Sequence, residues 1–379
     1  MNDFRARAVI STKALLRNLD RVRGVAGVDV MAVVKADAYG HGVDYIARLL
    51  REHGVTWLGV ALPSEALALR ASGDQGNILA WLTTPGDPDL ARCVAQDVDL
   101  SVSSIREMTE IIAAAESLNT VARIHIKIDT GLSRNGVQLD NLGAILELAQ
   151  TGIANQRIYV RGVWSHLASA DHVDPEIARR SVAEQIDVFE KALTICANAG
   201  ITPEIRHMAN TAGALWHPAS RYDLVRIGIG MYGLSPNSDR STANELGLVP
   251  AMQVQARISS VKEISTGTGV SYGHTWRADT STLIGLVPIG YADGLPRNLG
   301  NKVEFAVDGS RIAQIGTIAM DQCVVKLDSV PGTKPGDTVS VFGPGTRGEM
   351  TADEMASLMG TVGYEIVTRL GVRVPRVYQ

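Results

Sequence analysis

The sequence predicts a two-part α/β protein, with an N-terminal (β/α)8 TIM-like barrel followed by a C-terminal, mostly antiparallel β-domain. In the first two thirds, short apolar runs alternate with longer amphipathic stretches. Several of these runs are rich in β-branched residues and do not alternate with polar ones, as in parallel strands that are buried on both faces. After Leu234 the pattern changes to short apolar runs that Gly and Pro separate, which is typical of antiparallel β structure.

Eight strand–helix units are expected in the first part, the number that closes a barrel of about 250 residues. The strands are predicted at Val28–Val34, Thr56–Val60, Asn77–Leu82, Val98–Val102, Val121–Ile128, Ile158–Trp164, Glu204–His207 and Asp223–Ile227. The helical patterns between them include Val43–His53, Ser64–Ser72, Ser104–Leu118 and Glu176–Ala199. A doubly wound open sheet is the alternative, because uncertain strand boundaries make the strand count soft.

The polar segment SPNSDRSTANELG after Leu234 predicts a linker. We therefore divide the chain into residues 1–236 and 237–379, and residues 1–10 can pack with the β-domain. Strands of this domain are predicted at Met252–Val261, Thr282–Pro288, Val303–Val307, Val324–Leu327 and Thr338–Phe342. A late helix is expected over Ala352–Met359, with Thr351 as its N-cap.

Composition excludes several classes of protein. The 379 residues are 45% hydrophobic and 20% charged, with a net charge of −4. These values argue against disorder, and the absence of basic runs argues against nucleic acid as a partner. No apolar run is long enough to span a membrane, and the N-terminus lacks the apolar core of a signal peptide. Cys93, Cys196 and Cys323 lie far apart, as expected for buried thiols in a reducing compartment. We therefore expect a cytoplasmic enzyme.

Charged and titratable residues follow the predicted barrel strands, where the reacting groups of such barrels lie. They are Lys35, Lys127, Arg134, His166, His207 and Arg226, with Asn210 beside them. Each alone is more often a solvated surface residue, but their convergence predicts a site. Lys35 directly follows the apolar strand VMAVV, so burial should lower its pKa and free the amine for Schiff-base chemistry. The carbonyl partner can belong to a substrate or to pyridoxal phosphate.

Two other patterns carry less weight. Gly228, Gly230 and Gly233 spell G-x-G-x-x-G, but LSPNSD follows and the motif lies late in the chain, which disfavours nicotinamide binding. His166, Asp171, His172 and Asp174 form a cluster whose spacing matches no common zinc pattern. We expect no metal site there.

The segment VVKADAYGHG resembles the cofactor-lysine motif of the alanine racemases, barrel-fold enzymes that use pyridoxal 5′-phosphate (PLP). The resemblance continues through KIDTGLSRNG, SHLASAD, HMANTAG, VRIGIGMYGL, VSYGHTW, IGYADGLPR, AMDQ and TVGYEIVTRLGVRVPRVY. It implies a two-base, PLP-dependent interconversion of L-alanine and D-alanine that supplies D-alanine for peptidoglycan. It also implies a head-to-tail homodimer in which two subunits share each active site.

The resemblance implies roles for individual residues. Lys35 and Tyr272 match the two catalytic bases. The cofactor-binding positions are matched by Lys35, Tyr39, His166, Asn210, Thr211, Arg226, Gly228, Ile229 and Tyr364. Among them, Arg226 matches the arginine that faces the pyridine nitrogen, His166 matches its hydrogen-bonding partner, and His207 is expected to help orient it.

The substrate side follows in the same way. Arg134 and the backbone N–H of Met320 match groups that hold the substrate carboxylate. Lys127 matches a lysine that is often carbamylated, and Tyr291 and Arg297 match residues that line the entrance.

The chain departs from the family in one motif, and related classes remain to be separated. Where relatives often read GRxCMDQ, this chain has GTIAMDQ with Thr317 and Ala319, which puts the electrostatics of the entrance in question. The barrel-fold decarboxylases place a glutamate at the position of Arg226, and a barrel-only PLP-binding protein would lack VSYGHTW. A broad-specificity racemase would share nearly every motif and is the remaining alternative.

Overall fold

The computed structural model describes residues 4–379, which form two compact units. One unit consists of residues 19–38 and 43–231, and the other of the segment up to Asn18 with residues 39–42 and 232–379. Among the described residues, no helix combines the length and the apolar character needed to cross a membrane.

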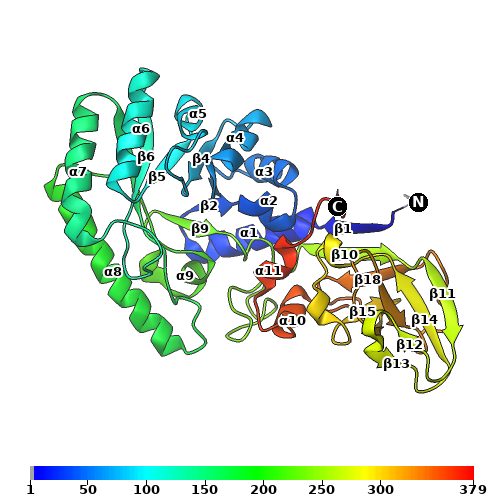
Figure 1. The fold of residues 1–379 in the computed structure, drawn as a ribbon. Helices are drawn as coiled ribbons and strands as arrows, with labels where there is room; N and C mark the ends of the chain where they lie inside the picture. The colour runs from blue at the N-terminus through cyan, green and yellow to red at the C-terminus, as the bar shows by residue number, and fades with distance from the viewer. Residues whose placement is uncertain (1–3) are drawn as a thin grey trace. The chain divides into compact units, whose positions relative to one another are not determined.

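The first unit is a barrel of parallel strands with helices outside it (Figure 1). Its eight strands pair in the order β8-β7-β6-β5-β4-β3-β2-β9. They are β2 (Asp29–Val33), β3 (Trp57–Val60), β4 (Asn77–Ala80), β5 (Asp99–Val102), β6 (Ala122–Lys127), β7 (Ile158–Trp164), β8 (Ile205–His207) and β9 (Leu224–Ile227). The ring closes because the Asp223 and Arg226 N–H groups donate to the Arg206 and Ala209 carbonyls, at 3.1 and 2.9 Å. The predicted barrel is confirmed, and the open sheet is wrong.

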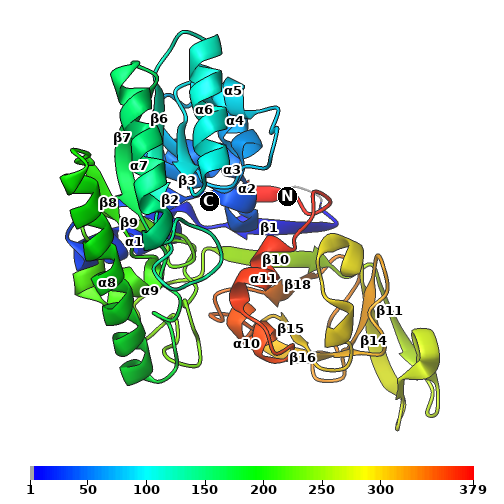
Figure 2. The ribbon, with the colours of Figure 1, turned by 60° about the vertical axis from the view of Figure 1, so that its left-hand side comes forward.

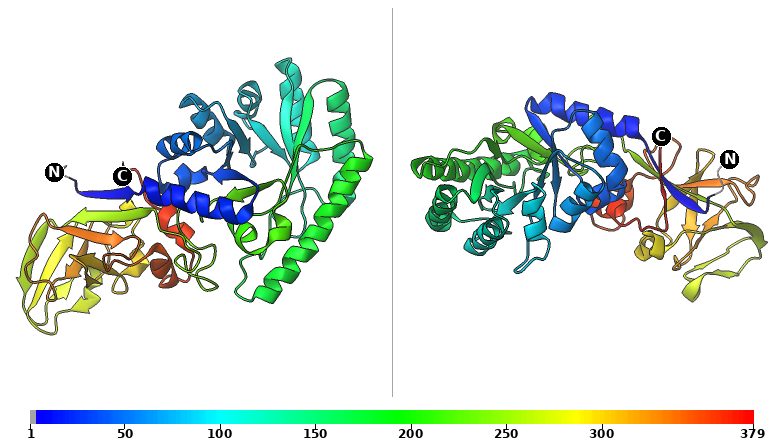
Figure 3. Two further views of the ribbon diagram at one scale, coloured as in Figure 1. Left: turned by 180° about the vertical axis from the view of Figure 1, so that it is seen from behind. Right: turned by 90° about the horizontal axis from the view of Figure 1, so that it is seen from above.

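The helices of this unit alternate with the strands, as the amphipathic pattern predicted (Figure 3). They are α3 (Val43–Glu52), α4 (Pro63–Ala71), α5 (Leu90–Ala95), α6 (Ile105–Ser117), α7 (Leu139–Ala154), α8 (Pro175–Asn198), α9 (Thr211–Trp216) and the short η1 (Pro218–Ser220), while α1 (Thr12–Ala26) connects β1 to β2. Polar side chains cap α6 and α8 among them: the Ser104 hydroxyl accepts from Glu107 N at 3.2 Å, and the Asp174 carboxylate accepts from Glu176 N at 2.9 Å.

The barrel interior explains the uninterrupted apolar runs. All four residues of β3 are apolar and buried, and so are Ile78, Leu79 and Ala80 of β4. Met31, Trp57, Leu79 and Leu224 pack together as one buried cluster. Strands of this kind have apolar neighbours on both faces, so their sequences do not alternate.

The segment α2 (Lys35–Gly40), which a single residue separates from the end of β2, is wound left-handed. Ala36, Asp37, Ala38 and Tyr39 have φ between 52° and 55°, a region that costs L-residues about 1–2 kcal/mol each. Hydrogen bonds hold the turn: Ala36 N donates to Glu65 Oε1 at 2.7 Å, and Val43 N donates to Asp37 Oδ1 at 2.8 Å. The sequence does not predict this conformation.

The second unit is built on a nine-stranded sheet in the order β11-β14-β17-β16-β15-β18-β10-β1-β19 (Figure 2). Its strands are β1 (Ala6–Ile10), β10 (Met252–Arg257), β11 (Ser260–Ile264), β14 (Thr282–Val287), β15 (Glu304–Val307), β16 (Ser310–Ile315), β17 (Cys323–Lys326), β18 (Thr338–Phe342) and β19 (Arg376–Tyr378), with β12 (Gly269–Val270) and β13 (Trp276–Arg277) as a separate ribbon. The pairing is antiparallel except between β1 and β19. The predicted antiparallel domain is confirmed.

One predicted strand of this unit is wrong. The run Met252–Val261 is two strands, because β10 pairs with β1 and β18 whereas β11 pairs with β14. Between them, Ile258 N donates to Asp337 O and Ser259 N to Leu286 O, so the chain changes partners within one apolar run.

Short helices complete the second unit: η2 (Tyr272–His274), η3 (Tyr291–Asp293), η4 (Arg297–Leu299), α10 (Ala352–Ser357) and α11 (Gly363–Thr368). The predicted cap of α10 is present, since Thr351 Oγ1 accepts from Glu354 N at 3.1 Å.

Candidate active site

Four cations gather at the carboxyl end of the barrel strands. Lys35 follows β2, Lys127 ends β6, Arg134 lies in the loop after β6, and Arg226 lies in β9. Burial and then Arg134 lower the pKa of Lys35, while Glu65 opposes the shift. Burial, Arg134 and Arg226 lower the pKa of Lys127 to about 7. The predicted pKa shift of Lys35 is therefore present, and the mutual repulsion of these groups favours an anionic ligand.

Two tryptophans lie beside these cations. Lys127 Nζ is 4.5 Å and Arg226 Cζ 4.7 Å from the centre of the Trp164 ring. Lys35 Nζ is 5.9 Å from the centre of the Trp81 ring. The faces of aromatic rings attract cations, so both tryptophans help to accommodate the positive charge. Charge at strand ends does not identify these two residues in the sequence, although both lie at strand ends.

Arg226 is held from several sides. Its Nη2 donates to the Ser165 and Met208 carbonyls, at 2.8 and 2.9 Å. The same Nη2 lies 3.0 Å from His166 Nδ1, and Nη1 lies 3.1 Å from His207 Nδ1. Because a guanidinium only donates, both Nδ1 atoms must accept, and each neutral ring carries its proton on Nε2.

The pKa values of this group agree with that assignment. Burial, followed by the charge of Arg226, lowers the pKa of both His166 and His207 well below the ordinary histidine range. Burial and Arg134 lower the pKa of Arg226 to about 9, so it remains a cation at neutral pH.

A small cradle lies between the start of α9 and the turn after β9. Asn210 caps α9 by accepting from Gly213 N at 3.0 Å. Gly230 N lies 3.4 Å from Thr211 Oγ1, and a Cβ at Gly230 would come within 2.6 Å of Thr211 Cγ2. The Gly228–Ile229–Gly230 backbone can therefore approach the Thr211 hydroxyl closely, which suits a phosphate group. Turns rather than a helix follow these glycines, so the dinucleotide alternative is wrong.

The remaining candidates belong to the second unit. Tyr39 packs against Tyr232 and Tyr364, with ring centres 4.8 and 6.2 Å apart. Burial raises the pKa of Tyr39. The hydroxyl of Tyr39 therefore stays protonated and is suited to donating a hydrogen bond.

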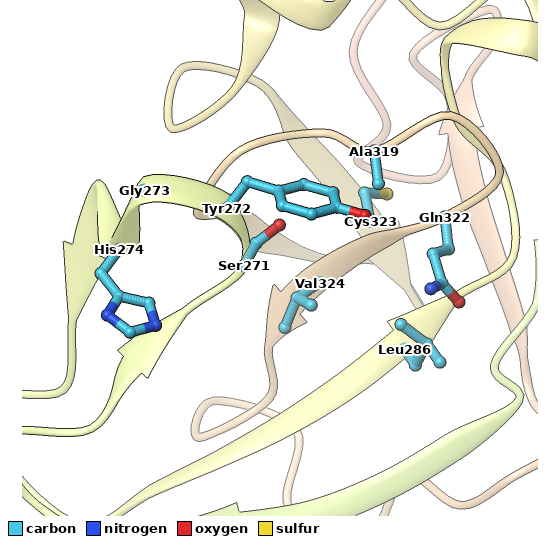
Figure 4. A pocket seen from close by; sticks show the side chains of 9 residues that line it. All are labelled: Ser271, Tyr272, Gly273, His274, Leu286, Ala319, Gln322, Cys323 and Val324. Atoms are coloured by element: carbon cyan, nitrogen blue, oxygen red, sulfur yellow. The ribbon is translucent and has the colours of Figure 1, made fainter.

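Tyr272 lies in a hollow of about 460 Å³ and is 71% exposed. Figure 4 shows its ring lying across the hollow, with the hydroxyl toward Ala319 and Cys323. Thr317 Oγ1 donates to the Tyr272 carbonyl at 2.8 Å, and Ser271 Oγ donates to the Thr317 carbonyl at 2.6 Å. The departure from the family motif at position 317 thus supplies a hydroxyl that holds the backbone of Tyr272.

Met320 is exposed, and its carbonyl accepts from Ala292 N at 3.0 Å. Tyr291 and Arg297 line a second hollow of about 360 Å³, together with Arg369. The structure thus groups Lys35, Lys127, Arg134, His166, His207, Asn210, Thr211, Arg226, Gly228 and Ile229 in the barrel unit, and Tyr39, Tyr272, Tyr291, Arg297, Met320 and Tyr364 in the other. Among residues 4–379, no cluster of three or more His, Cys, Asp or Glu side chains could hold a metal ion.

Two family models match the chain one after the other. The model for the N-terminal domain of alanine racemase matches residues 10–236, and the model for its C-terminal domain matches residues 251–378. Alanine racemase of Beutenbergia cavernae is 47% identical over 378 residues, which are 99% of this chain and 98% of that protein. Alanine racemase of Streptomyces coelicolor is 44% identical, over 99% of this chain and 96% of that protein. The crystal structure of alanine racemase from D-cycloserine-producing Streptomyces lavendulae has a TM-score of 0.95 at 42% identity, covering 100% of this chain and 98% of the other.

Proposed function

The chain belongs to the alanine racemase family and interconverts L-alanine and D-alanine, and we propose that it does so with PLP on Lys35. The observation that carries the proposal is Lys35 itself, an amine of lowered pKa two residues after the end of β2. A neutral amine is the form that reacts with an aldehyde. When bound, PLP withdraws electrons from the amino acid and so acidifies its Cα proton.

The other groups of the barrel unit fit this cofactor. The Thr211 hydroxyl, with the backbone of Gly228 and Ile229, would hold the phosphate, and Tyr39 and Tyr364 are the proposed partners from the second unit. Asn210 supports this position by capping α9. Arg226, with His166 on its Nη2, would face the ring nitrogen. A guanidinium does not readily give up a proton, so this nitrogen would stay unprotonated, which favours proton return over transamination or decarboxylation.

Racemisation needs a proton removed from one face of Cα and returned on the other. We assign these steps to Tyr272 and Lys35. Tyr272 takes the proton of L-alanine, and Lys35 as its ammonium protonates the opposite face; the reverse reaction exchanges their roles. Arg134 and the backbone N–H of Met320 bind the substrate carboxylate, and Tyr291 and Arg297 line the entrance.

The exposure of Tyr272 supports a shared active site. A solvated phenol is a weak base near neutral pH, so a working base in this position needs a partner surface that excludes water. Leu62, Leu82 and Ile105 follow β3, β4 and β5 and are exposed apolar side chains on the end of the barrel that carries Lys35. We propose a head-to-tail homodimer in which Tyr272 of one subunit covers this end of the other.

Lys127 is the proposed carbamylated lysine. With a pKa of about 7, it is partly a neutral amine at neutral pH, the form that reacts with carbon dioxide. The carbamate would replace a positive charge beside Arg134 with a negative one. Arg134 would then be held in place for the substrate carboxylate.

Three broader assignments complete the proposal. The enzyme supplies D-alanine for peptidoglycan and works in the cytoplasm. The free thiols of Cys93, Cys196 and Cys323 support the cytoplasmic assignment, because disulfides are rare in that compartment. The domain division is residues 1–236 and 237–379.

The test is racemisation by the purified protein in both directions, together with its visible absorption spectrum. Lys35→Ala should abolish both the cofactor absorption and the activity. Borohydride reduction of the wild type should attach the cofactor to Lys35, and attachment at Lys127 instead would refute the assignment. Serine, lysine and arginine assayed beside alanine would reveal a broad-specificity racemase.

A further inference from the structure

A chain of buried polar side chains runs through the barrel from Arg226. His207 Nε2 lies 2.9 Å from His125 Nδ1, and His125 Nε2 lies 3.1 Å from Asp99 Oδ2. Both histidines and Asp99 are fully buried. Together with the contact between Arg226 and His207, these bonds connect residues of four barrel strands: Asp99 of β5, His125 of β6, His207 of β8 and Arg226 of β9. We call this chain the Arg226–Asp99 relay.

The two ends of the relay fix which atoms donate and which accept in its hydrogen bonds. Arg226 can only donate, so His207 Nδ1 must accept and His207 Nε2 must carry the proton. His125 Nδ1 then accepts a hydrogen bond from His207 Nε2–H, and His125 Nε2–H donates to the carboxylate of Asp99, which accepts only. Each imidazole is therefore held as the neutral tautomer with its proton on Nε2, and neither ring can reverse without placing two N–H groups against each other.

The surroundings are shaped to hold the relay. A Cβ at Gly162 would overlap the ring of His125, so only glycine leaves room for it at that point of β7. The ring of Trp164 stacks on His207, with centres 5.4 Å apart and planes 2° from parallel. Arg123 Nε and Arg161 Nη1 approach Asp99 at 3.2 and 3.4 Å, and they balance its charge.

A relay of buried polar side chains costs folding free energy in a barrel interior, which apolar side chains usually fill. A buried polar network stabilises the fold only when every member is satisfied, and removing one member leaves buried donors or acceptors without partners. A single apolar residue in place of each would avoid this cost.

We propose that Asp99 and His125 are positioning residues for the racemase reaction: through His207 they hold the guanidinium of Arg226 in the orientation that faces the cofactor ring. This inference rests on the role proposed for Arg226. Asp99 and His125 themselves touch neither substrate nor cofactor in this scheme, and they act only by fixing the tautomer and the place of His207.

The test compares Asp99→Asn and His125→Gln with the wild type. Asp99→Asn retains the shape but adds a donor, which permits the wrong tautomer at His125. His125→Gln interrupts the relay at another point and leaves Asp99 paired with both arginines. This variant therefore tests the proposal if Asp99→Asn fails to fold. Asp97→Asn is the matched control, because Asp97 is an exposed carboxylate that pairs with the same Arg123 at 3.2 Å but lies outside the relay.

The first readout is independent of the loaded enzyme. In cofactor-free protein labelled with ¹⁵N-histidine, wild-type His207 should show one protonated and one bare ring nitrogen, unchanged across neutral pH. In both relay variants the contact between Arg226 and His207 should loosen, so that His207 populates both tautomers, and Asp97→Asn should leave the single wild-type tautomer unchanged. The second readout is kinetic. We expect kcat to fall about 10- to 100-fold in the relay variants and KM to change much less, because losing a hydrogen-bonding partner that orients a functional histidine has an effect of this size.

The outcomes separate the two proposals. A wild-type protein without racemase activity would refute the function proposed for the site. An active wild type whose relay variants keep both the His207 tautomer and kcat would refute the relay alone. Altered tautomers with unchanged kcat would show a structural network that does not position Arg226, and would also overturn the inference.

Discussion

Glu65 is expected to hold the left-handed turn that follows Lys35. Its Oε1 accepts from Ala36 N at 2.7 Å, and its Oε2 accepts from Ala61 N and Leu62 N at 2.9 and 3.0 Å. The carboxylate thus joins the end of β3 to the residue after Lys35. It also favours the charged form of Lys35, opposing the effects of burial and Arg134 on the pKa of that lysine.

Glu65→Gln is the informative change, because the side chain keeps its size but has one accepting oxygen instead of two. If the oxygen stays with Ala61 and Leu62, an NH₂ group faces the N–H of Ala36, and that hydrogen bond is lost. A hydrogen bond to a charged group contributes about 1.5–3 kcal/mol. Since Glu65 is only partly buried, we expect a loss of about 2 kcal/mol. The strain of the left-handed turn, about 1–2 kcal/mol per residue, favours opening once this bond is gone.

Native-state hydrogen exchange of the cofactor-free protein measures this loss directly. About 2 kcal/mol corresponds to roughly 30-fold faster exchange at Ala36 N–H. The pKa of Lys35 should fall further in Glu65→Gln, and the pH dependence of its acylation rate would report the shift. Glu176→Gln is the control, since Glu176 forms an exposed pair with Arg179 and should change neither quantity. Unchanged exchange at Ala36 together with an unchanged Lys35 pKa would refute this reasoning.

Three further predictions concern the rest of the site. Arg226→Glu should slow racemisation and raise the fraction of turnovers that end in pyruvate; a slower reaction without more pyruvate would mean that Arg226 is structural. Lys35→Ala and Tyr272→Phe should each lose about 10²–10⁴-fold in activity. Mixed in equal amounts with subunit exchange, they should recover about a quarter of wild-type activity, and no recovery despite demonstrated exchange would rule out the shared site. The free energy of unfolding of the cofactor-free protein should rise between about pH 7 and 10, because the unfolded chain still binds a proton that folded Lys127 has lost. Lys127→Met should flatten this rise, whereas Lys13→Met on the surface should leave it unchanged.

The barrel could be predicted from the sequence because its strands carry a simple physical signal. Residues of a strand that is buried on both faces are mostly apolar, as in β3, which is buried throughout. The same signal failed at Met252–Val261, because a change of pairing partner between β10 and β11 leaves no mark on the hydrophobicity of the run. Periodicity reports burial, and it does not report which strand is the neighbour.

Some residues of the candidate site could likewise be predicted from the sequence, and others could not. Lys35, Lys127 and Arg226 could be found because the ends of parallel strands meet at one end of a barrel. The left-handed turn over Ala36–Tyr39 could not, since no glycine marks these four positions and hydrogen bonds from outside the segment hold their φ values. His125 and Asp99 were also missed, because a polar residue inside a strand looks the same in the sequence whether it faces water or a buried partner.

Two groups of charges in the barrel unit have different consequences. Asp99, at the start of β5, has Arg123 and Arg161 beside it, so its charge is balanced by protein groups alone. At the other end of the strands, Lys35 and Lys127 both have lowered pKa values, and Arg134 is among the causes for each. A phosphate dianion and a substrate carboxylate would relieve that repulsion, so their binding should stabilise the barrel as well as supply the reaction. Protein groups thus balance the charge of Asp99, whereas we expect anionic ligands to balance the charges of Lys35, Lys127 and Arg134.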